Sequence, residues 1–488
     1  MLIAWTLSFV LLAAPLVDAV KHHDKAAVRA LLGKHVDVNA PEADGATALH
    51  WAAYEEDAEI VDLLLAAGAN VNAATDLQIT PLYLASTTGN AAIVNTLLER
   101  GADPNRASES GVTPLMQAAR SGSVAAVRGL LNRGARVNAK EQSRQQTALM
   151  WAVAEHQPEV VKVLLDAHAD VRARTSVRTL TVMLDQGPRR TVKTAMQDAR
   201  QIEAGGSTAL LFAAQVGDVE STRLLLNAGA DVNDTAADGS SALVVATFSG
   251  HGNVARVLID AGANTNAAAA GYTALHAAVL RGDLQTVNAL LGNGANPNAQ
   301  MTKGSPVRRF GSQWALPSTM TGATPLFVAA LYLETEIMRA LLGAGANYAL
   351  GLANRTTPLL AAAGSPVEKE ARPSDLARWH VVDSDAPTIP RAEADVLNAT
   401  RQLLDAGANV NDANDAGDTP LHIAAAAGMT IVIQLLADKG AMLDAKNKSG
   451  QTPLALTLPR DRQEGRPGAT SGSKGAEELL RRLGATQN

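Results

Sequence analysis

Cysteine is absent from this sequence of 488 residues, and aromatic residues make up only 3% of it. The lack of cysteine excludes disulfides, thiolate metal sites and a cysteine nucleophile. Few aromatic residues, together with abundant alanine and leucine, favour thin and closely stacked helices over a large aromatic core. The net charge of −6 gives no general reason to expect nucleic-acid binding.

Long apolar runs are also missing, apart from one at the N-terminus. The uncharged run from Leu2 to Ala14 is short for a membrane span, and Pro15 breaks it. Val17-Asp18-Ala19 offers a small-residue cleavage pattern, so residues 1–19 are predicted to be a signal peptide, although no basic residue precedes the run. We therefore expect an exported protein, periplasmic or secreted. The alternative is that this segment is the first repeat helix of a cytoplasmic protein.

A short motif at the predicted start of a helix is repeated along the rest of the chain. A Thr/Ser-x-Leu motif recurs, mostly 32 to 34 residues apart, at Thr47, Thr80, Thr113, Thr147, Thr208, Ser241, Thr273, Thr324, Thr357, Thr419 and Thr452. Such a fixed period is the signature of a repeat array, in which each unit stacks on its neighbours.

The residues of each unit have physical reasons. Threonine is a good helix N-cap, and a following proline, as in Thr80-Pro81, suits the first helical position. Gly89 falls where the first helix must stop, and a second helix with apolar residues at helical spacing follows. A closing Gly-Ala-x-x-Asn, as in Gly101 to Asn105, ends that helix, and its asparagine can bond the backbone of the turn.

Whole units such as "TPLYLASTTGNAAIVNTLLERGADPN" from Thr80 carry a resemblance to the ankyrin-repeat family. The chain also resembles long bacterial ankyrin-repeat proteins with an N-terminal export signal. The resemblance implies an all-α ankyrin-repeat solenoid of stacked helix-turn-helix units with finger loops, about 11–12 repeats in all.

Three histidines, His50, His276 and His422, occupy one slot of the repeat. Other units carry apolar or aromatic residues there, for example Tyr83 and Leu211. We therefore predict that these histidines support packing and hydrogen bonding around the turn, as the family resemblance implies, and perform no chemistry.

The array is interrupted by insertions, which define the predicted domain organisation. The predicted segments are a signal peptide (1–19), an N-terminal partial or capping repeat (20–46), ankyrin repeats (47–171), a basic hairpin insertion (172–206), ankyrin repeats (207–299), a basic finger insertion (300–321), ankyrin repeats (322–364), an insertion between two helices (365–395), ankyrin repeats (396–458), a flexible loop (459–475) and a C-terminal capping helix (476–488).

The first two insertions are basic within an acidic chain. The first contains seven basic and three acidic residues between Arg172 and Gly206. We predict that Arg189 and Arg190 here, with Arg308 and Arg309 in the second insertion, attract an acidic protein partner. The alternative is that long solvated loops simply collect charge.

A second candidate surface comes from the ends of the first helices, which face the concave surface in ankyrin proteins. Exposed apolar side chains in one patch commonly mark a partner site. The predicted partner-binding residues are Phe248, Leu280, Arg281, Leu331 and Tyr332, together with Phe310 and Trp314 of the second insertion. The alternative is that this insertion folds back and covers the patch as part of the core.

No phosphate-binding loop, zinc-binding helix or nucleophile elbow occurs in the sequence. We therefore predict no catalytic residues, no cofactor and no metal. The expected function is a monomeric, non-catalytic scaffold that binds a protein, with no nucleic acid and no integral membrane segment in the mature chain. The alternatives are an exported ligand-binding or enzymatic protein with its site in the insertions, and a structural envelope spacer.

Overall fold

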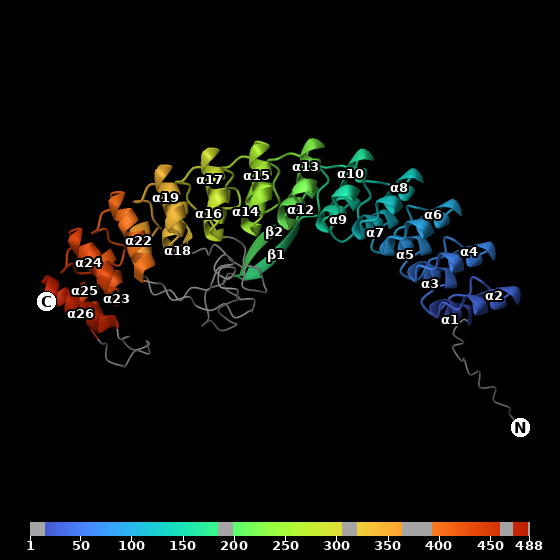
Figure 1. Cartoon of the computed structure of the whole chain (residues 1–488), viewed down its shortest axis with the longest axis horizontal. Coiled ribbons are helices and arrows are strands. Elements are labelled where there is room, and N and C mark those ends of the chain that lie inside the picture. The colour runs from blue at the N-terminus through green and yellow to red at the C-terminus, as the bar shows by residue number, and fades with distance from the viewer. Residues whose placement is uncertain (1–14, 184–198, 305–319, 364–392, 459–471, 487–488) are drawn as a thin grey trace, which may run out of the picture. The chain divides into compact units, whose positions relative to one another are not determined.

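The computed structural model describes residues 15–183, 199–304, 320–363, 393–458 and 472–486. The chain divides into two compact units: unit 1 comprises residues 1–177 and 205–234, and unit 2 comprises residues 178–204 and 235–488. In each unit short helices follow one another in pairs, and each pair packs against the next (Figure 1). The predicted all-α repeat solenoid is confirmed.

Unit 1 has six helix pairs in its described residues. They are α1 (Pro15–Lys21) with α2 (Lys25–Gly33), α3 (Ala48–Tyr54) with α4 (Ala58–Ala66), α5 (Pro81–Thr88) with α6 (Ala91–Glu99), α7 (Pro114–Ser121) with α8 (Val124–Asn132), α9 (Ala148–Ala154) with α10 (Pro158–Asp166), and α12 (Ala209–Val216) with α13 (Val219–Asn227).

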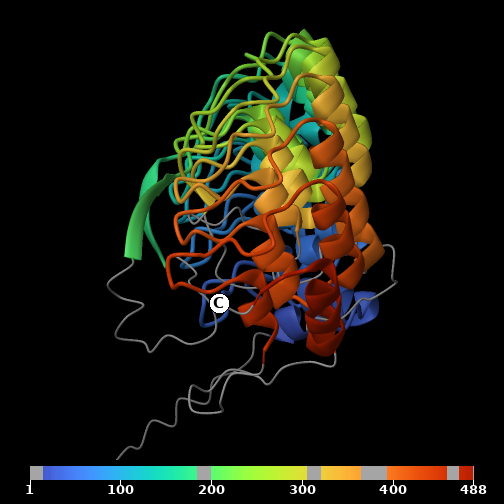
Figure 2. The same ribbon diagram turned by 90° about the vertical axis from the view of Figure 1, so that its left-hand side faces the viewer.

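Unit 2 also has six pairs in the part that the structure describes, and the loops that join them lie on one side of the helices (Figure 2). They are α14 (Ala242–Ser249) with α15 (Gly252–Asp260), α16 (Ala274–Arg281) with α17 (Leu284–Gly292), α18 (Pro325–Tyr332) with α19 (Thr335–Gly343), α20 (Pro358–Ala362) with α22 (Glu393–Asp405), α23 (Pro420–Ala426) with α24 (Thr430–Asp438), and α25 (Pro453–Thr457) with α26 (Gly472–Leu483).

The helices begin and end at the residues that the repeat marks. In α5 the Thr80 hydroxyl accepts a hydrogen bond from the backbone N–H of Tyr83 at 3.2 Å, and Pro81 fills the first turn. Gly89 ends the helix with φ 77°, a conformation that glycine adopts without strain. The second helix, α6, buries Ile93, Val94, Leu97 and Leu98 between the layers, so each pair depends on its neighbours for a core.

Asparagine side chains join successive repeats along the closing turns. The Asn72 side-chain amide donates to the carbonyl oxygen of Gly101 at 3.0 Å, and its Oδ1 accepts from the backbone N–H of Asp103 at 2.8 Å. The same two bonds to the next turn are made by Asn39, Asn105 and Asn138 in unit 1 and by Asn266, Asn298 and Asn411 in unit 2. We call this series the asparagine ladder.

The ladder lacks its asparagine beside the first and third insertions. Arg172 holds the ladder position in unit 1, and there Arg174 makes an ion pair with Asp234 and donates to the carbonyl oxygen of Gly206 at 2.7 Å. Ala349 holds it in unit 2, where the Tyr348 hydroxyl lies against Gly407 so closely that a Cβ atom there would come within 2.9 Å. Different contacts therefore connect the neighbouring turns at these two places.

The first helix pair forms a complete layer. Leu16, Val17 and Val20 of α1 are buried, and α1 packs against both α2 and α3. A cleavage after Ala19 would therefore cut through a helix of this layer. Residues 1–14, which contain the apolar run, lie outside the described residues.

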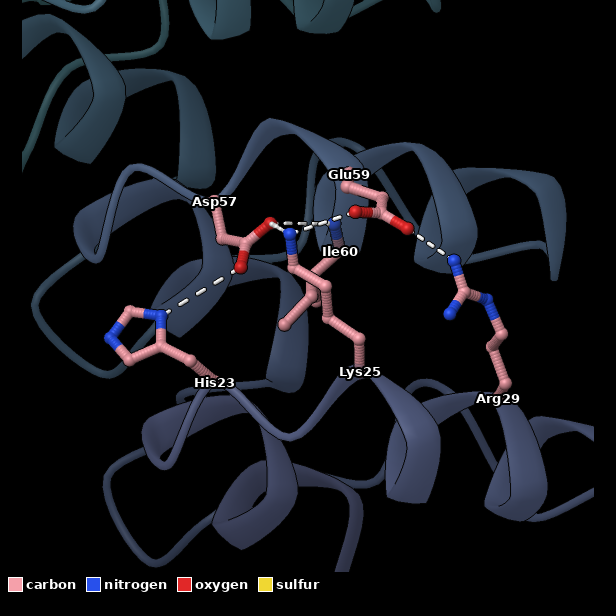
Figure 3. Close-up of polar contacts among 6 residues, drawn as sticks. All are labelled: His23, Lys25, Arg29, Asp57, Glu59 and Ile60. Carbon is pink, nitrogen blue, oxygen red and sulfur yellow. Dashed lines mark hydrogen bonds and ion pairs between the residues drawn. The ribbon is translucent and has the colours of Figure 1, made fainter.

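An ion-pair network links the first layer to the second (Figure 3). The Lys25 Nζ lies 2.7 Å from a Glu59 oxygen and 3.5 Å from an Asp57 oxygen, and Arg29 also pairs with Glu59. The hydrogen bond between Lys25 and Glu59 raises the pKa of Lys25 and lowers that of Glu59. Because both side chains are well exposed, water screens the pair, and the network adds little to the stability of the stack.

The insertions occupy two kinds of position. Strands β1 (Arg178–Met183) and β2 (Ala199–Ala204) form an antiparallel hairpin within the first insertion. The third insertion separates α20 from α22 and the fourth separates α25 from α26, so both fall inside a helix pair. Within the described ranges, no helix is both long and apolar enough to cross a membrane.

We expect Asn72→Ala to destabilise unit 1 by roughly 1 kcal/mol, because both of its ladder bonds are lost while water can solvate the exposed turn. Urea unfolding followed by circular dichroism would measure the change. Asn132→Ala is the matched control, because Asn132 is exposed and its side chain makes no hydrogen bond within the part of the chain that the structure describes. Equal midpoints for the two variants would contradict a stabilising ladder.

We expect His168→Gly to stabilise the protein by about 0.5–1 kcal/mol. His168 is exposed and has φ 62° at a turn where most other repeats carry glycine, such as Gly68 and Gly101, and where the first repeat carries His35 with φ 55°. Thermal unfolding would show the gain. His168→Ala keeps a Cβ atom and should not show it, so a similar rise in both variants would argue against backbone strain as the cause.

Candidate binding surfaces

The histidine of the repeated turn connects one repeat to the next. The ring Nδ1 of His50 accepts from the backbone N–H of Thr47 at 3.0 Å, and Nε2 donates to the carbonyl oxygen of Ile79 at 3.0 Å. His276 and His422 make the same pair of bonds, and all three rings are at most 1% exposed. The Nδ1 atom must be unprotonated to accept this bond, so the rings are neutral. The structural prediction for these residues is confirmed.

Burial lowers the pKa of all three rings, because a charged imidazole loses its hydration inside the stack. For His276 the pKa falls to about 4, although the hydrogen bond to the carbonyl oxygen of Ala323 acts in the opposite direction. The folded protein thus excludes a proton that the unfolded chain binds in mildly acidic solution.

The predicted apolar patch in unit 2 is largely occupied by contacts within the protein. Phe248 is half-buried, and its ring packs against the Tyr272 ring with centroids 5.8 Å apart. Arg281 donates through both Nε, at 2.7 Å, and Nη2 to the carbonyl oxygen of Phe248. Burial lowers the pKa of Arg281, and burial together with the nearby Asp238 carboxylate raises that of Tyr272.

Leu280 differs from the prediction of an exposed anchor. Its side chain is 1% exposed at the end of α16, so in this structure it belongs to the core and cannot contact a partner. Leu331 and Tyr332 at the end of α18 are half-buried and have interactions of their own. The patch therefore exposes less apolar surface than the sequence suggested, and Phe248 and Tyr332 are its aromatic members.

Six other predicted residues cannot be compared with the structure. Arg189 and Arg190 lie in residues 184–198, and Arg308, Arg309, Phe310 and Trp314 lie in residues 305–319, which are outside the described residues. Their part in partner binding stays a prediction.

An aromatic and charged cluster in unit 1 was not predicted. The Lys21 Nζ lies 4.1 Å from the Trp51 ring centroid and 2.7 Å from a Glu42 oxygen, and the Trp51 ring N–H donates to Glu42 at 2.6 Å. Tyr54 stands edge-on to Trp51 and is 50% exposed. The signal was present in the sequence, because Tyr54 occupies the helix-end column where the next unit has Thr87.

The hairpin formed by β1 and β2 is the regular structure described in the first insertion. Leu180 of β1 lies opposite Ile202 of β2, and Arg178 lies opposite Ala204. The side chains of Arg178, Thr179, Leu180 and Thr181 are all exposed, and Leu180 is 41% exposed. The chain at the base of the hairpin is fixed by a hydrogen bond from the N–H of Thr175 to the carbonyl oxygen of Ser207 at 3.0 Å and by its reciprocal bond to the Thr175 hydroxyl, also 3.0 Å.

The stacked helix pairs, the αL turns and the hydrogen bonds between repeats define a helical repeat protein. A family model described as ankyrin repeats (3 copies) matches residues 16–108, 107–175, 180–269, 210–301 and 392–463, which together exceed half of the chain. The chain therefore belongs to the ankyrin-repeat family. No curated protein matches it.

We expect the free energy of unfolding to fall as the pH is lowered from about 6.5 to 4. In this range the unfolded His276, with an ordinary pKa of about 6.5, gains a proton while the folded ring stays neutral. Each such histidine adds a slope of at most about 1.4 kcal/mol per pH unit, and above about pH 6.5 it adds none. Urea midpoints between about pH 4.5 and 7.5 would measure the slope.

The variant for this titration is His276→Leu, because leucine fills the same slot at Leu211 and Leu360. It should lose roughly 1–3 kcal/mol at about pH 7.5, because the buried N–H of Thr273 loses its ring acceptor, whereas the carbonyl oxygen of Ala323 keeps the N–H of Met301 as a donor. Its stability should also depend less on pH. His168→Gln, which replaces an exposed histidine, is the control variant. Identical slopes for wild type and His276→Leu would contradict a neutral buried ring.

Proposed function

We propose that this protein is a non-catalytic scaffold that binds a protein partner through its first-insertion hairpin and the helix ends of its concave face. Ankyrin repeats are generally protein–protein interaction modules, and their fold is typically non-enzymatic. The observation that carries the proposal is the hairpin, whose described β1 side chains are all exposed on a base fixed by Thr175 and Ser207. A fixed base limits the entropy that is lost on binding.

Charge supports an acidic partner. The sequence between Arg172 and Gly206 has four more basic than acidic residues, within a chain of net charge −6. A local excess of positive charge steers an acidic surface toward the hairpin and raises the association rate. Of these residues Arg174 already pairs with Asp234, so Arg178 is the exposed arginine of β1 available to a partner.

The helix ends of unit 2 are the second part of the proposed surface. Phe248 and Tyr332 are half-buried, so part of each residue is accessible. Aromatic residues with such partial exposure are frequent anchors in interfaces. Leu280 is no longer part of this surface, because it is buried.

Export and a monomeric state complete the proposal, and both come from the sequence alone. The support for export is the apolar run from Leu2 to Ala14. The burial of Leu16 and Val17 adds a condition, since a mature chain that begins after Ala19 would lack these core residues.

Affinity capture from the native cell envelope tests the proposal, with the full chain as bait beside two variants. The first variant lacks residues 178–204 and joins Val177 to Gly205. This deletion keeps Arg174 with its ion pair, and a Cβ atom on Gly205 would come within 2.0 Å of the Ser176 carbonyl oxygen, so the two ends lie close together. The second variant combines Phe248→Ala with Tyr332→Ala.

We expect the full chain to retain a protein that the hairpin deletion loses. Circular dichroism of both variants would show that the stack is still folded. A partner lost only from the Phe248/Tyr332 variant would move the site to the helix ends. No partner for the full chain would contradict the scaffold.

A further inference from the structure

The hairpin offers the backbone of an open sheet edge. Within the described residues β1 and β2 pair only with each other, through the register Arg178↔Ala204 to Met183↔Ala199. Each strand therefore has one side whose N–H and C=O groups face away from the ladder. A two-stranded sheet is marginally stable in water, and a third strand would stabilise it.

The two edges differ in charge. The described residues of β1 are all exposed and its sequence, Arg-Thr-Leu-Thr-Val-Met, contains no acidic residue. The sequence of β2 contains Arg200 and the exposed Glu203, so its charges balance, and its Ile202 and Ala204 are half-buried. Among the described residues the side chains of β1 are therefore more exposed than those of β2, and β1 is the strand that an acidic segment can approach without meeting an acidic residue on it.

We infer that the outer edge of β1 receives an extended acidic segment of the partner, which pairs with β1 as a third strand. The inference rests on the proposed function and assigns the mode of binding at the same hairpin. Strand addition supplies affinity through main-chain hydrogen bonds and specificity through alternate side chains.

The side chains of β1 specify the occupant. Arg178 and Leu180 are two residues apart and share one face of the sheet, while Thr179 and Thr181 share the other. A paired segment places an acidic residue beside Arg178 and an apolar residue beside Leu180, with β-branched residues between them. The sequence pattern that fits is an acidic and an apolar residue separated by one position.

The test uses the full chain and a fluorescent seven-residue probe, acetyl-Thr-Val-Thr-Asp-Thr-Val-Thr-amide, which carries this pattern in both chain directions. Fluorescence anisotropy would compare it with a probe that has lysine in place of aspartate. Two further probes carry methyl groups on alternate backbone nitrogens, one set for each edge of the peptide. The protein variants are R178E and, as an exposed charge reversal elsewhere in the same insertion, E203K.

We expect saturable binding of the aspartate probe, at least ten-fold weaker binding of it to R178E, and recovery when R178E is offered the lysine probe. One of the methylated probes should bind at least ten-fold more weakly, because it lacks the N–H groups that face β1. E203K should bind the aspartate probe at least as well as the wild type.

Equal binding of the aspartate and lysine probes, equal binding of all methylated probes, or no binding would overturn strand addition. A dimer in analytical ultracentrifugation that disappears on deletion of residues 178–204 would also overturn it, because a second copy would then occupy the edge. If capture retains a hairpin-dependent partner while the probes fail, the scaffold stands and only the strand-addition mode is wrong. If the probes bind but no partner is captured, β1 accepts an added strand, while the proposed scaffold function loses its support.

Discussion

The stack depends on hydrogen bonds that run from each closing turn to the next. Most helices of the pairs have only seven to nine residues, a length at which an isolated helix does not persist in water. Their cores are shared between layers, so neighbouring layers must lie in register for their leucines and alanines to be buried. The asparagine ladder and the buried histidines do this with side chains whose bonds reach one repeat further along the chain, as Asn72 and His50 show.

The repeat motif predicted most of the fold because its signals are local. A threonine cap, a proline in the first turn and a glycine with positive φ act within one helix, so Thr80, Pro81 and Gly89 mark α5 without knowledge of the neighbours. The candidate surface was harder to predict. Leu280 follows the same sequence pattern as an exposed helix-end residue, yet the folded structure buries it. The link between Arg174 and Asp234 spans sixty residues, beyond any periodic signal.

The features that distinguish this protein from a regular array of repeats lie in its insertions. The histidine slot accepts Tyr83, Met116 or Leu211 in other repeats, so the repeat fold does not require a histidine at this position. The hairpin, by comparison, has no counterpart elsewhere in the described chain and leaves a basic and an apolar side chain in water. These exposed side chains are the observation on which the proposed binding surface rests.

Contacts among Arg174, Thr175, Ser207 and Asp234 close the base of the first insertion, and we call them the clasp. Because of the clasp, the stability of the stack depends little on the length of the insertion. Arg174, Thr175 and Ser207 connect the two sides below the hairpin, and Asp234 ties the clasp to the next turn. Chain added beyond the clasp costs only loop entropy, about 0.6 kcal/mol for each doubling of length. Evolution or protein engineering can therefore replace the segment between Thr175 and Ser207 by one of another length and sequence. The helix pairs on either side of the insertion stay the same.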